Sequence, residues 1–347
     1  MLPFDYIAHI SDVILYAYQH RASDLHFEPG ANHYQIRMRQ HGLLTLIFRG
    51  SLDIAARITT QLKVMAQLDI AEQRLPQDGR ISFMRHTAHP LDIRINCCPT
   101  LFGEKIVLRL LDQNTQVRSL NALGLTLEQM NIFQHALARP QGLILVTGPT
   151  GSGKTTTLYT ALHCLNQDTQ HIVTVEDPIE ITVPGVTQIP VHEKINLNFA
   201  RILRSVLRQD PDIIMVGEIR DKETAEIAIQ AAQTGHLVLS TLHASNGLET
   251  INRLVHMGIA RYELISSLSL IIAQRLLRTL AGKERIGVYE CIPMTPAVKQ
   301  YLIHEHAPAY STLKQHVPCL TLREAALQKV ALGLTSLTEV NRMVQDD

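Results

Sequence analysis

The residues whose types and spacing could do chemistry are concentrated in the middle of this 347-residue sequence. Residues 148–155 read Gly-Pro-Thr-Gly-Ser-Gly-Lys-Thr and fit the pattern G-x-x-x-x-G-K-[ST], which cradles phosphate groups. The apolar segment 143–147 precedes this loop, and residues 156–165 continue after it as a helix-forming segment. Strand, glycine-rich loop and helix in this order are the context that the motif requires, so we predict a phosphate-binding loop at a helix N-terminus.

Each position of this loop has a physical reason for its residue type. The glycines allow the backbone to fold into a nest whose N–H groups point at phosphate oxygens. Lys154 is expected to reach the β- and γ-phosphates, and the hydroxyl of Thr155 is expected to ligate Mg²⁺. The predicted nucleotide-binding residues are Gly148, Pro149, Thr150, Gly151, Ser152, Gly153, Lys154, Thr155 and Thr156.

Two further apolar segments end in acidic residues, which a nucleotide site needs beside its phosphate loop. Residues 171–181 carry three of them, and residues 211–221 end in Glu218 and Asp221 around Arg220. A carboxylate at the C-terminal end of a strand can hold Mg²⁺ or orient the attacking water. Glu218 is one candidate for this role and Glu180 is the other, and the sequence does not rank them.

A fourth apolar segment, residues 237–242, is bracketed by two histidines. Lone histidines are more often structural groups than catalytic ones, but at a strand that follows the other elements they can sense the γ-phosphate. We therefore predict that His236 and His243 couple the state of the γ-phosphate to the position of a neighbouring domain.

Farther upstream, residues 91–111 predict a β-hairpin that carries two arginines. Apolar and polar residues alternate over 91–98 and again over 105–111, and residues 99–104 contain the Pro and Gly of a turn. If Cys98 pairs with Lys105, then Arg94 faces Arg109. Two like charges side by side destabilise a sheet unless an anion lies between them. The alternative is that both arginines belong to a solvated polar face.

The composition narrows the class of protein further. Lys+Arg and Asp+Glu both number 32, so the net charge of zero gives no footprint for general nucleic-acid binding. The five cysteines form no C-x-x-C pair and are expected to be reduced thiols of a cytoplasmic protein, with Cys97 pointing inward and Cys98 outward.

No apolar run approaches the roughly 18–20 residues of a transmembrane helix. The first residues lack the basic start of a signal peptide and predict an amphipathic helix around Ile7, Ile10, Val13, Ile14 and Ala17.

Taken together, these segments resemble the ATPases of type II secretion and type IV pilus systems, and the resemblance covers nearly the whole chain. Four motifs of that family occur in order: Walker A (148–155), Asp box (175–180), Walker B (212–218) and His box (236–243). The segments ASDLHFEP (22–29), LPQDGRISF (75–83) and AQRLL (273–277) also match the family, as does the predicted hairpin.

The resemblance implies an α/β fold in which a RecA-like, additional-strand P-loop ATPase domain follows a smaller α+β, PAS-like domain. The implied boundaries are 1–112 for the N-terminal domain, 113–124 for a linker, and 125–347 for the ATPase domain with a small helical C-terminal subdomain. In this family, arginines of the N-terminal domain reach the nucleotide, which implies that Arg94 and Arg109 are arginine fingers. ATP and Mg²⁺ are the implied ligands, with Thr155 and Glu218 near the metal.

The resemblance also implies a homohexamer that hydrolyses ATP to assemble or extrude a type IV pilus, a competence pseudopilus or a type II secretion pseudopilus. Its implied partners are an inner-membrane platform protein and cytoplasmic membrane-recruitment proteins, so the expected location is the cytoplasm, peripherally on the inner membrane. No nucleic acid and no zinc are expected. The residues of the motifs resemble those of the pilus-extension and secretion ATPases of the family more than those of the retraction motors. The tetracysteine zinc loop is missing, and the chain starts directly at the N-terminal domain, as in compact competence ATPases.

Three alternatives remain at this point. A pilus retraction ATPase is the alternative within the family. A nucleic-acid translocating P-loop motor and a scaffold that binds ATP without hydrolysing it are the alternatives outside it.

Overall fold

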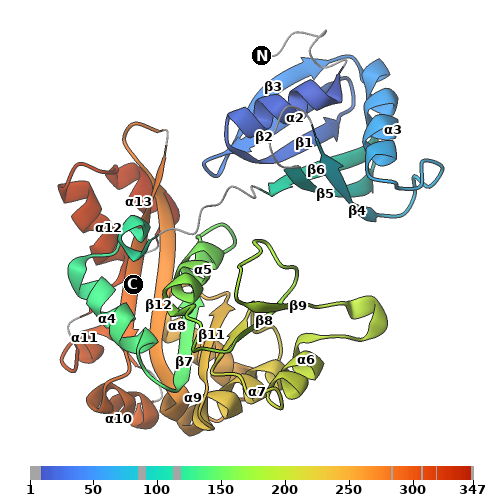
Figure 1. The fold of residues 1–347 in the computed structure, drawn as a ribbon. Coiled ribbons are helices and arrows are strands. Elements are labelled where there is room, and N and C mark those ends of the chain that lie inside the picture. Colours follow the sequence, from blue (N-terminus) through green and yellow to red (C-terminus); the bar gives the residue numbers. More distant parts are fainter. Residues whose placement is uncertain are drawn as a thin grey trace. The chain divides into compact units, whose positions relative to one another are not determined.

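Buried hydrophobic side chains form separate cores in two units of the chain, Met1–Gln116 and Val117–Asp347 (Figure 1). The computed structural model describes residues 9–84, 91–111, 119–282, 284–305, 308–317 and 319–344. The first half of the predicted linker, residues 113–118, lies outside this described part. Its end is a short 3-10 helix, η2 (Leu120–Leu123), which Gly124 terminates with a φ of 85°.

The first unit is a six-stranded antiparallel sheet with two helices packed on one face. The strand order is β3-β2-β1-β6-β5-β4. The elements are α2 (Ile10–Gln19), β1 (Ala22–Pro29), β2 (Tyr34–Gln40), β3 (Leu43–Gly50), η1 (Leu52–Ile54), α3 (Ala55–Met65), β4 (Gln77–Phe83), β5 (Leu91–Thr100) and β6 (Gly103–Leu111). The predicted amphipathic helix is confirmed, because Ile10, Val13, Ile14 and Ala17 form the buried face of α2. The predicted Ile7 lies outside the described residues.

Strands β5 and β6 confirm the predicted hairpin and its register. Cys98 pairs with Lys105, and Arg94 pairs with Arg109. Cys97 is buried and Cys98 is exposed, as predicted. The turn is shorter than expected, because pairing continues to Thr100 and Gly103 and leaves only two residues between the strands.

The second unit is built on a seven-stranded sheet with the order β13-β12-β7-β11-β10-β8-β9. All neighbours are parallel except β12 and β13, which form a long antiparallel pair. The strands are β7 (Gly142–Thr147), β8 (Ile172–Glu176), β9 (Thr187–Pro190), β10 (Ile213–Val216), β11 (Leu237–Leu242), β12 (Leu268–Arg278) and β13 (Arg285–Pro293). Four predicted strands correspond to β7, β8, β10 and β11, and the α/β fold class is confirmed. The β12–β13 hairpin was not predicted.

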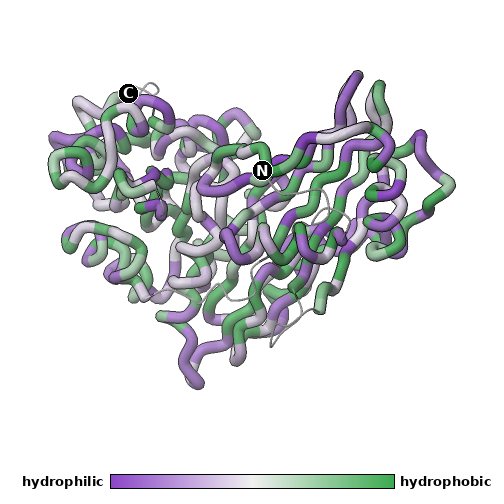
Figure 2. The backbone as a smooth tube through the Cα atoms, turned by 90° about the horizontal axis from the view of Figure 1, so that it is seen from above, coloured by the Kyte–Doolittle hydropathy of each residue, from purple (hydrophilic) through white to green (hydrophobic). Residues whose placement is uncertain are grey.

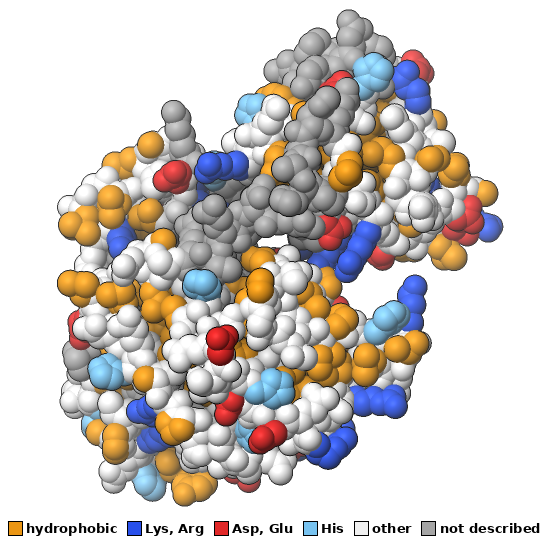
Figure 3. Space-filling view, viewed as in Figure 1, with side chains coloured by type: hydrophobic (Ala, Val, Ile, Leu, Met, Phe, Trp, Pro, Cys, Tyr) orange, Lys and Arg blue, Asp and Glu red, His pale blue; other side chains and the backbone are white. Residues whose placement is uncertain are grey.

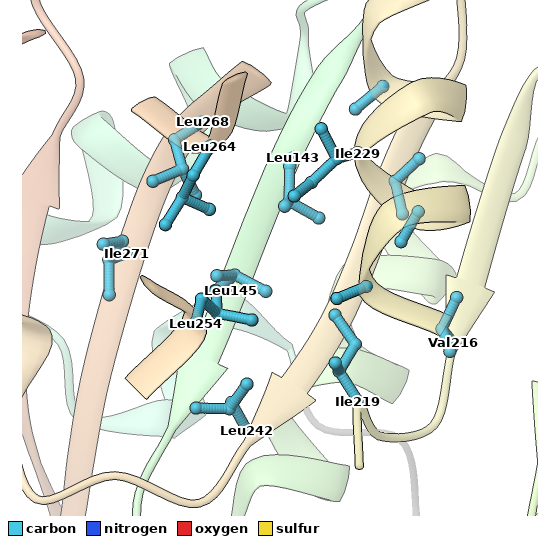
Figure 4. Packing of buried hydrophobic residues seen from close by; sticks show 14 of the residues in the cluster. Leu143, Leu145, Val216, Ile219, Ile229, Leu242, Leu254, Leu264, Leu268 and Ile271 are labelled. Carbon is cyan, nitrogen blue, oxygen red and sulfur yellow. The ribbon is translucent and has the colours of Figure 1, made fainter. Parts of the chain in front are cut away.

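Helices cover both faces of this sheet, because side chains in its buried strands alternate between two cores. One core contains α4 (Leu127–Leu137) and α5 (Lys154–Leu165). The other contains α6 (Phe199–Val206), α7 (Lys222–Gln233), α8 (Gly247–His256), α9 (Arg261–Ser267), α10 (Pro296–His304) and α11 (Tyr310–Leu313). Figure 4 shows Leu143 of β7 close to Ile229 of α7.

Hydrophobic stretches run along the strands, and hydrophilic ones are frequent in the loops (Figure 2). A further 3-10 turn, η3 (Glu193–Ile195), lies between β9 and α6. Within the described residues, no helix combines the length and the apolar character needed to span a bilayer.

The C-terminal subdomain consists of α12 (Leu322–Ala331) and α13 (Leu337–Met343), which are separated at Gly333. Both helices pack on β12 and β13 through a small core of their own. Glu339 of α13 ties this subdomain to the sheet, because its carboxylate accepts hydrogen bonds from Arg278 of β12 and from Arg342. Only 4% of the Glu339 side chain is exposed.

The environment of Glu339 predicts a loss of stability in acid. Burial raises the pKa of Glu339, but hydrogen bonds from Arg342 and Arg278 outweigh it and lower the pKa from 4.5 to about 2. A depressed carboxyl pKa stabilises the fold above about pH 4.5, and this contribution is lost as the pH falls toward 2. Urea denaturation between pH 6 and pH 3 should therefore show a smaller decrease in the free energy of unfolding for Glu339→Gln than for the wild type, by roughly 2 kcal/mol.

The exposed Glu128 of α4 offers a matched control for this experiment. Glu128→Gln should keep the wild-type pH dependence. Parallel curves for Glu339→Gln and the wild type would show that the ion pairs of Glu339 do not stabilise the subdomain.

A candidate nucleotide site at the glycine-rich loop

The predicted phosphate loop connects the end of β7 to the start of α5, as expected from its sequence. Gly153 precedes the first helical residue with a φ of 90°, in the left-handed region that glycine adopts most readily. A Cβ atom on Gly148 would lie 2.6 Å from both the carbonyl oxygen of Gln274 and the hydroxyl of Ser152. The loop therefore needs glycine at position 153 for its backbone conformation and at position 148 for close packing.

Lys154 lies inside this loop with only 9% of its surface exposed. Its Nζ donates to the carbonyl oxygens of Gly148 at 2.8 Å and Pro149 at 3.1 Å. Burial lowers the pKa of Lys154 to about 8, although the charge of Glu218 opposes this shift. The ammonium group is still mostly protonated at neutral pH, and within the described residues no carboxylate forms an ion pair with it. It is therefore a buried cation in a position to bind an anion.

Ser152 supports the same interpretation. Its side-chain oxygen is buried and has no hydrogen-bond partner within the described residues. Buried hydroxyl groups are normally paired, so an orphaned one inside a phosphate loop is consistent with a ligand that supplies the missing partner. The unpaired hydroxyl and the buried cation together fit a bound phosphate group.

The structure brings Glu218 to this loop. Glu218 follows β10 by two residues, and it is close enough to Lys154 to oppose the lowering of the lysine pKa. Its carboxylate accepts a hydrogen bond from Arg220, and Nε2 of His243 lies 3.6 Å from its second oxygen. Arg220 also forms an ion pair of 3.1 Å with Asp177. Glu218 and His243, which come from two different strand ends, thus share one corner of the site.

The other predicted acid, Glu180, lies in a different environment. Its side chain is exposed and makes no hydrogen bond or ion pair within the described residues. Glu176, at the end of β8, is buried and accepts hydrogen bonds from Tyr159 at 2.5 Å and Thr174 at 2.6 Å. Its oxygens are already satisfied, so Glu176 is a structural residue. The geometry therefore favours Glu218 over Glu180 as the acid beside the phosphate loop.

The two histidines do not lie together. His243 follows the C-terminal end of β11, where the phosphate loop also lies. His236 precedes the N-terminal end of the same strand, and Nδ1 of its ring lies 3.0 Å from the carbonyl oxygen of Ala231 in α7. Six extended residues separate them, which is roughly 20 Å along the strand. The prediction that both histidines respond to the γ-phosphate is therefore corrected: His236 stabilises the junction of α7 and β11.

Desolvation by burial lowers the pKa of His243, and the charge of Lys154 lowers it further. Glu218 opposes this shift without reversing it. The ring is therefore neutral at pH 7. A neutral imidazole beside Glu218 can donate or accept one hydrogen bond, and this makes His243 suited to sensing an oxygen atom near the carboxylate.

Two site residues on β12 were not assigned a role from the sequence. Gln274 is buried; its amide donates to the carbonyl oxygen of Ser152 at 2.7 Å and accepts from the hydroxyl of Thr157 at 2.8 Å. Arg275, the next residue, donates to the carbonyl oxygen of Ser245 at 2.6 Å. One strand therefore holds both the phosphate loop and the loop after His243. Both residues belong to the motif AQRLL, but the spacing of this motif from the two loops does not indicate that they are in contact.

The predicted arginines of the first unit lie in a row of charged residues that crosses its sheet. Pairing between successive strands places these residues side by side in the order Arg80, Arg94, Arg109, Asp24 and Arg39. Nε of Arg109 donates to Asp24 at 3.0 Å, and Nε of Arg39 lies 3.7 Å from the same carboxylate. The protein thus supplies one anion beside Arg109, and the row still contains four arginines and one carboxylate.

Another cluster on the same face of the sheet is better balanced. Glu28 of β1 forms ion pairs with Arg37 at 2.7 Å and Lys105 at 2.9 Å. Burial raises the pKa of Glu28, but hydrogen bonds from Arg37 and Lys105 outweigh it and lower the pKa to about 2. The excess positive charge of this face is therefore concentrated in the row that contains Arg94 and Arg109.

Comparison with known proteins agrees with this geometry. The family model described as "Type II/IV secretion system protein" matches residues 5–342. The type IV pilus assembly ATPase PilB of Acinetobacter baylyi is 44% identical over 384 aligned residues, which cover 98% of this chain and 66% of that protein. This chain therefore spans about two thirds of the length of that relative.

Two other similar proteins come from related systems. The type II secretion system ATPase E of Vibrio cholerae is 41% identical and aligns with 94% of this chain and 72% of its own length. The solved structure of the pilus retraction motor PilT with bound ADP is 30% identical, with a TM-score of 0.70 over 97% of each chain. The resemblance seen in the sequence motifs is thereby confirmed. This chain belongs to the type II/IV secretion system protein family.

Proposed function

We propose that this protein is a motor ATPase and that the glycine-rich loop is its catalytic nucleotide site. The observation that carries this proposal is the buried, protonated Lys154 inside the loop, next to Glu218 and His243. In the reaction, water attacks the γ-phosphorus and the bond to the β-phosphate oxygen breaks, giving ADP, inorganic phosphate and a proton. ADP in the PilT relative supports a nucleotide as the ligand.

Magnesium fits the same site. The hydroxyl of Thr155 is exposed at the start of α5, and Glu218 supplies a partly buried carboxylate; both are oxygen donors of the kind that Mg²⁺ prefers. When bound, the ion would neutralise charge on the phosphate oxygens. Glu218 would orient either the metal or the attacking water, Lys154 would hold the β- and γ-phosphates, and His243 would sense the γ-phosphate through its contact with Glu218. No zinc is expected.

Gln274 is a positioning residue in this mechanism. It holds the carbonyl group of Ser152 in the loop and the hydroxyl of Thr157 in the first turn of α5. A nest binds phosphate well only when its N–H groups already point inward. Fixing the loop from β12 therefore keeps the site ready for the nucleotide.

Arg94 and Arg109 are proposed to complete the site as arginine fingers. They lie side by side in a row of four arginines that also contains Asp24. A nucleotide phosphate would bind these guanidinium groups whenever the first unit closes on the second. Hydrolysis would weaken this attraction, and the domain movement that follows would perform the mechanical work.

The work is proposed to be the assembly of a pilus or of a secretion pseudopilus. Named relatives in pilus assembly and type II secretion support this choice, with identities above 40%. A homohexamer on the cytoplasmic face of the inner membrane, acting on a platform protein and its recruitment partners, is the proposed setting. Pilus retraction is the second candidate, because the structure of PilT is similar over nearly the whole chain.

A nucleic-acid motor is less well supported. The net charge is zero, and in the view of Figure 3 Lys and Arg side chains are scattered among acidic, polar and hydrophobic ones. A motor that tracks a nucleic-acid backbone would need a continuous basic surface.

The first test removes the charge of Lys154. Lys154→Ala should reduce ATP turnover by more than about 100-fold, because the phosphates lose the cation that holds them. The measurement is ADP formation by the purified full chain. Lys222→Ala, which removes an exposed lysine of α7, should leave turnover unchanged. Turnover that persists in Lys154→Ala would rule out this loop as the catalytic site.

The second test concerns the arginine fingers. Arg109→Ala and Arg94→Ala should each lower kcat, by about 10³-fold at the lower end of the range for such residues. Affinity for a fluorescent ATP analogue should change much less, because the fingers act mainly in the transition state. Arg49→Ala on the edge strand β3 is the control and should have wild-type activity. If both finger variants keep wild-type kcat, the finger assignment is wrong.

The third test addresses the support of the loop by Gln274. Gln274→Leu removes two hydrogen bonds and leaves the carbonyl group of Ser152 without its donor, so the KM for ATP should rise about tenfold. Circular dichroism should confirm that the variant is folded, and Gln233→Leu on the surface of α7 should keep the wild-type KM. A normal KM in folded Gln274→Leu would show that the loop holds its conformation without β12.

A further inference from the structure

A cavity of about 1040 Å³ opens beside the phosphate loop, within the second unit. Its lining begins at Pro149 and Thr150 of the loop and at His243, where the γ-phosphate of a bound nucleotide would lie. It continues along α8 and ends at Val344, after α13. The cavity thus leads from the proposed reaction centre to the C-terminal subdomain.

The walls of this cavity are rich in cationic side chains. The arginines that line it are Arg220, Arg253, Arg275 and Arg342, and His243 and His256 line it as well. The carboxylate that lines it is that of Glu249. An anion entering from the phosphate loop would therefore meet mainly positive groups.

The four arginines differ in whether their guanidinium groups already have partners within the protein. Arg220 and Arg342 form ion pairs with carboxylates, and Arg275, which is 8% exposed, donates to backbone carbonyl oxygens. Arg253 lies on α8, one turn before His256, and its side chain makes no hydrogen bond or ion pair within the described residues. Arg253 is therefore the cation on this wall that is available to a ligand.

We propose that this cavity binds the inorganic phosphate produced by hydrolysis, with Arg253 as its main ligand and His256 and Arg275 beside it. The proposal rests on the ATPase function proposed above. Phosphate leaves the γ-position through this cavity while ADP remains in the glycine-rich loop. Because the cavity is bounded by α8 and the C-terminal subdomain, the release of phosphate is linked to elements other than those that hold ADP.

The chemistry of the walls favours phosphate over a second nucleotide or a peptide. The lining contains no Phe, Tyr or Trp that could stack on a base or bury an aromatic side chain. Guanidinium groups bind phosphate oxygens through paired, charge-assisted hydrogen bonds. The cavity is far larger than one phosphate ion, so the ion would share it with water, as expected of an exit path.

The test is inhibition of ATP turnover by added inorganic phosphate, followed through ADP formation by the full chain. In Arg253→Ala, the phosphate concentration that halves turnover should rise about tenfold, the effect of losing one charge-assisted hydrogen bond. The KM for ATP should stay within about twofold, because Arg253 does not contact the loop that holds the nucleotide. Arg253→Lys should retain part of the inhibition, and Arg201→Ala on α6, away from the cavity, should behave as the wild type.

A binding measurement separates the cavity from the phosphate loop and does not depend on turnover. Isothermal titration of inorganic phosphate into the wild-type chain saturated with ADP and Mg²⁺ should show binding, and Arg253→Ala should weaken it about tenfold. Equal binding by the wild type and Arg253→Ala, or no binding by the wild type, would overturn the proposal. Turnover by Lys154→Ala would instead overturn the ATPase function, so the two failures can be distinguished.

Discussion

The position of Lys154 inside a glycine-rich loop is the constraint on which the rest of the second unit depends. A buried ammonium group without a carboxylate partner is unfavourable, and here backbone carbonyl oxygens compensate for it only in part. The loop must hold this charge without collapsing, and left-handed glycines provide the necessary conformation. A phosphate group is the natural partner, since it would satisfy Lys154, the hydroxyl of Ser152 and the N–H groups of the nest together.

Strand β12 and its partner β13 provide the support that the loop needs. Gln274 holds the phosphate loop, and Arg275 holds the loop after His243. Glu290 of β13 is completely buried and accepts from the backbone N–H of Gly247 at the start of α8 and from the hydroxyl of Tyr310. The same carboxylate accepts from the N–H of Leu322, where the C-terminal subdomain begins. One hairpin therefore connects the glycine-rich loop, the start of α8 and the last two helices.

In the first unit, positive charge is exposed on one face of the sheet. Its sheet buries most of its apolar side chains on one face and carries mainly polar ones on the other, where pairing between adjacent strands places arginines in one row. Asp24 relieves part of the repulsion next to Arg109 and also orients the guanidinium group. A nearby cluster around Glu28 shows that the fold can balance such charges when no ligand is needed. The side-by-side guanidinium groups of Arg94 and Arg109 are the basis on which an external anion is proposed as their ligand.

The sequence by itself determined the elements with strong periodicity or with special backbone needs. Alternation over residues 91–111 specified the pairing of Arg94 with Arg109, because a shift by one residue would expose the apolar side of the strand. The sequence also specified the phosphate-binding loop, because three closely spaced glycines followed by Lys and Thr rarely occur in another structural context. Only the tertiary structure placed Glu218 rather than Glu180 beside the glycine-rich loop, separated His236 from His243, and revealed the contacts of Gln274 and Arg275 and the cavity at Arg253. These depend on which strands become neighbours and how far apart their ends lie, and local sequence patterns do not encode such contacts between distant parts of the chain.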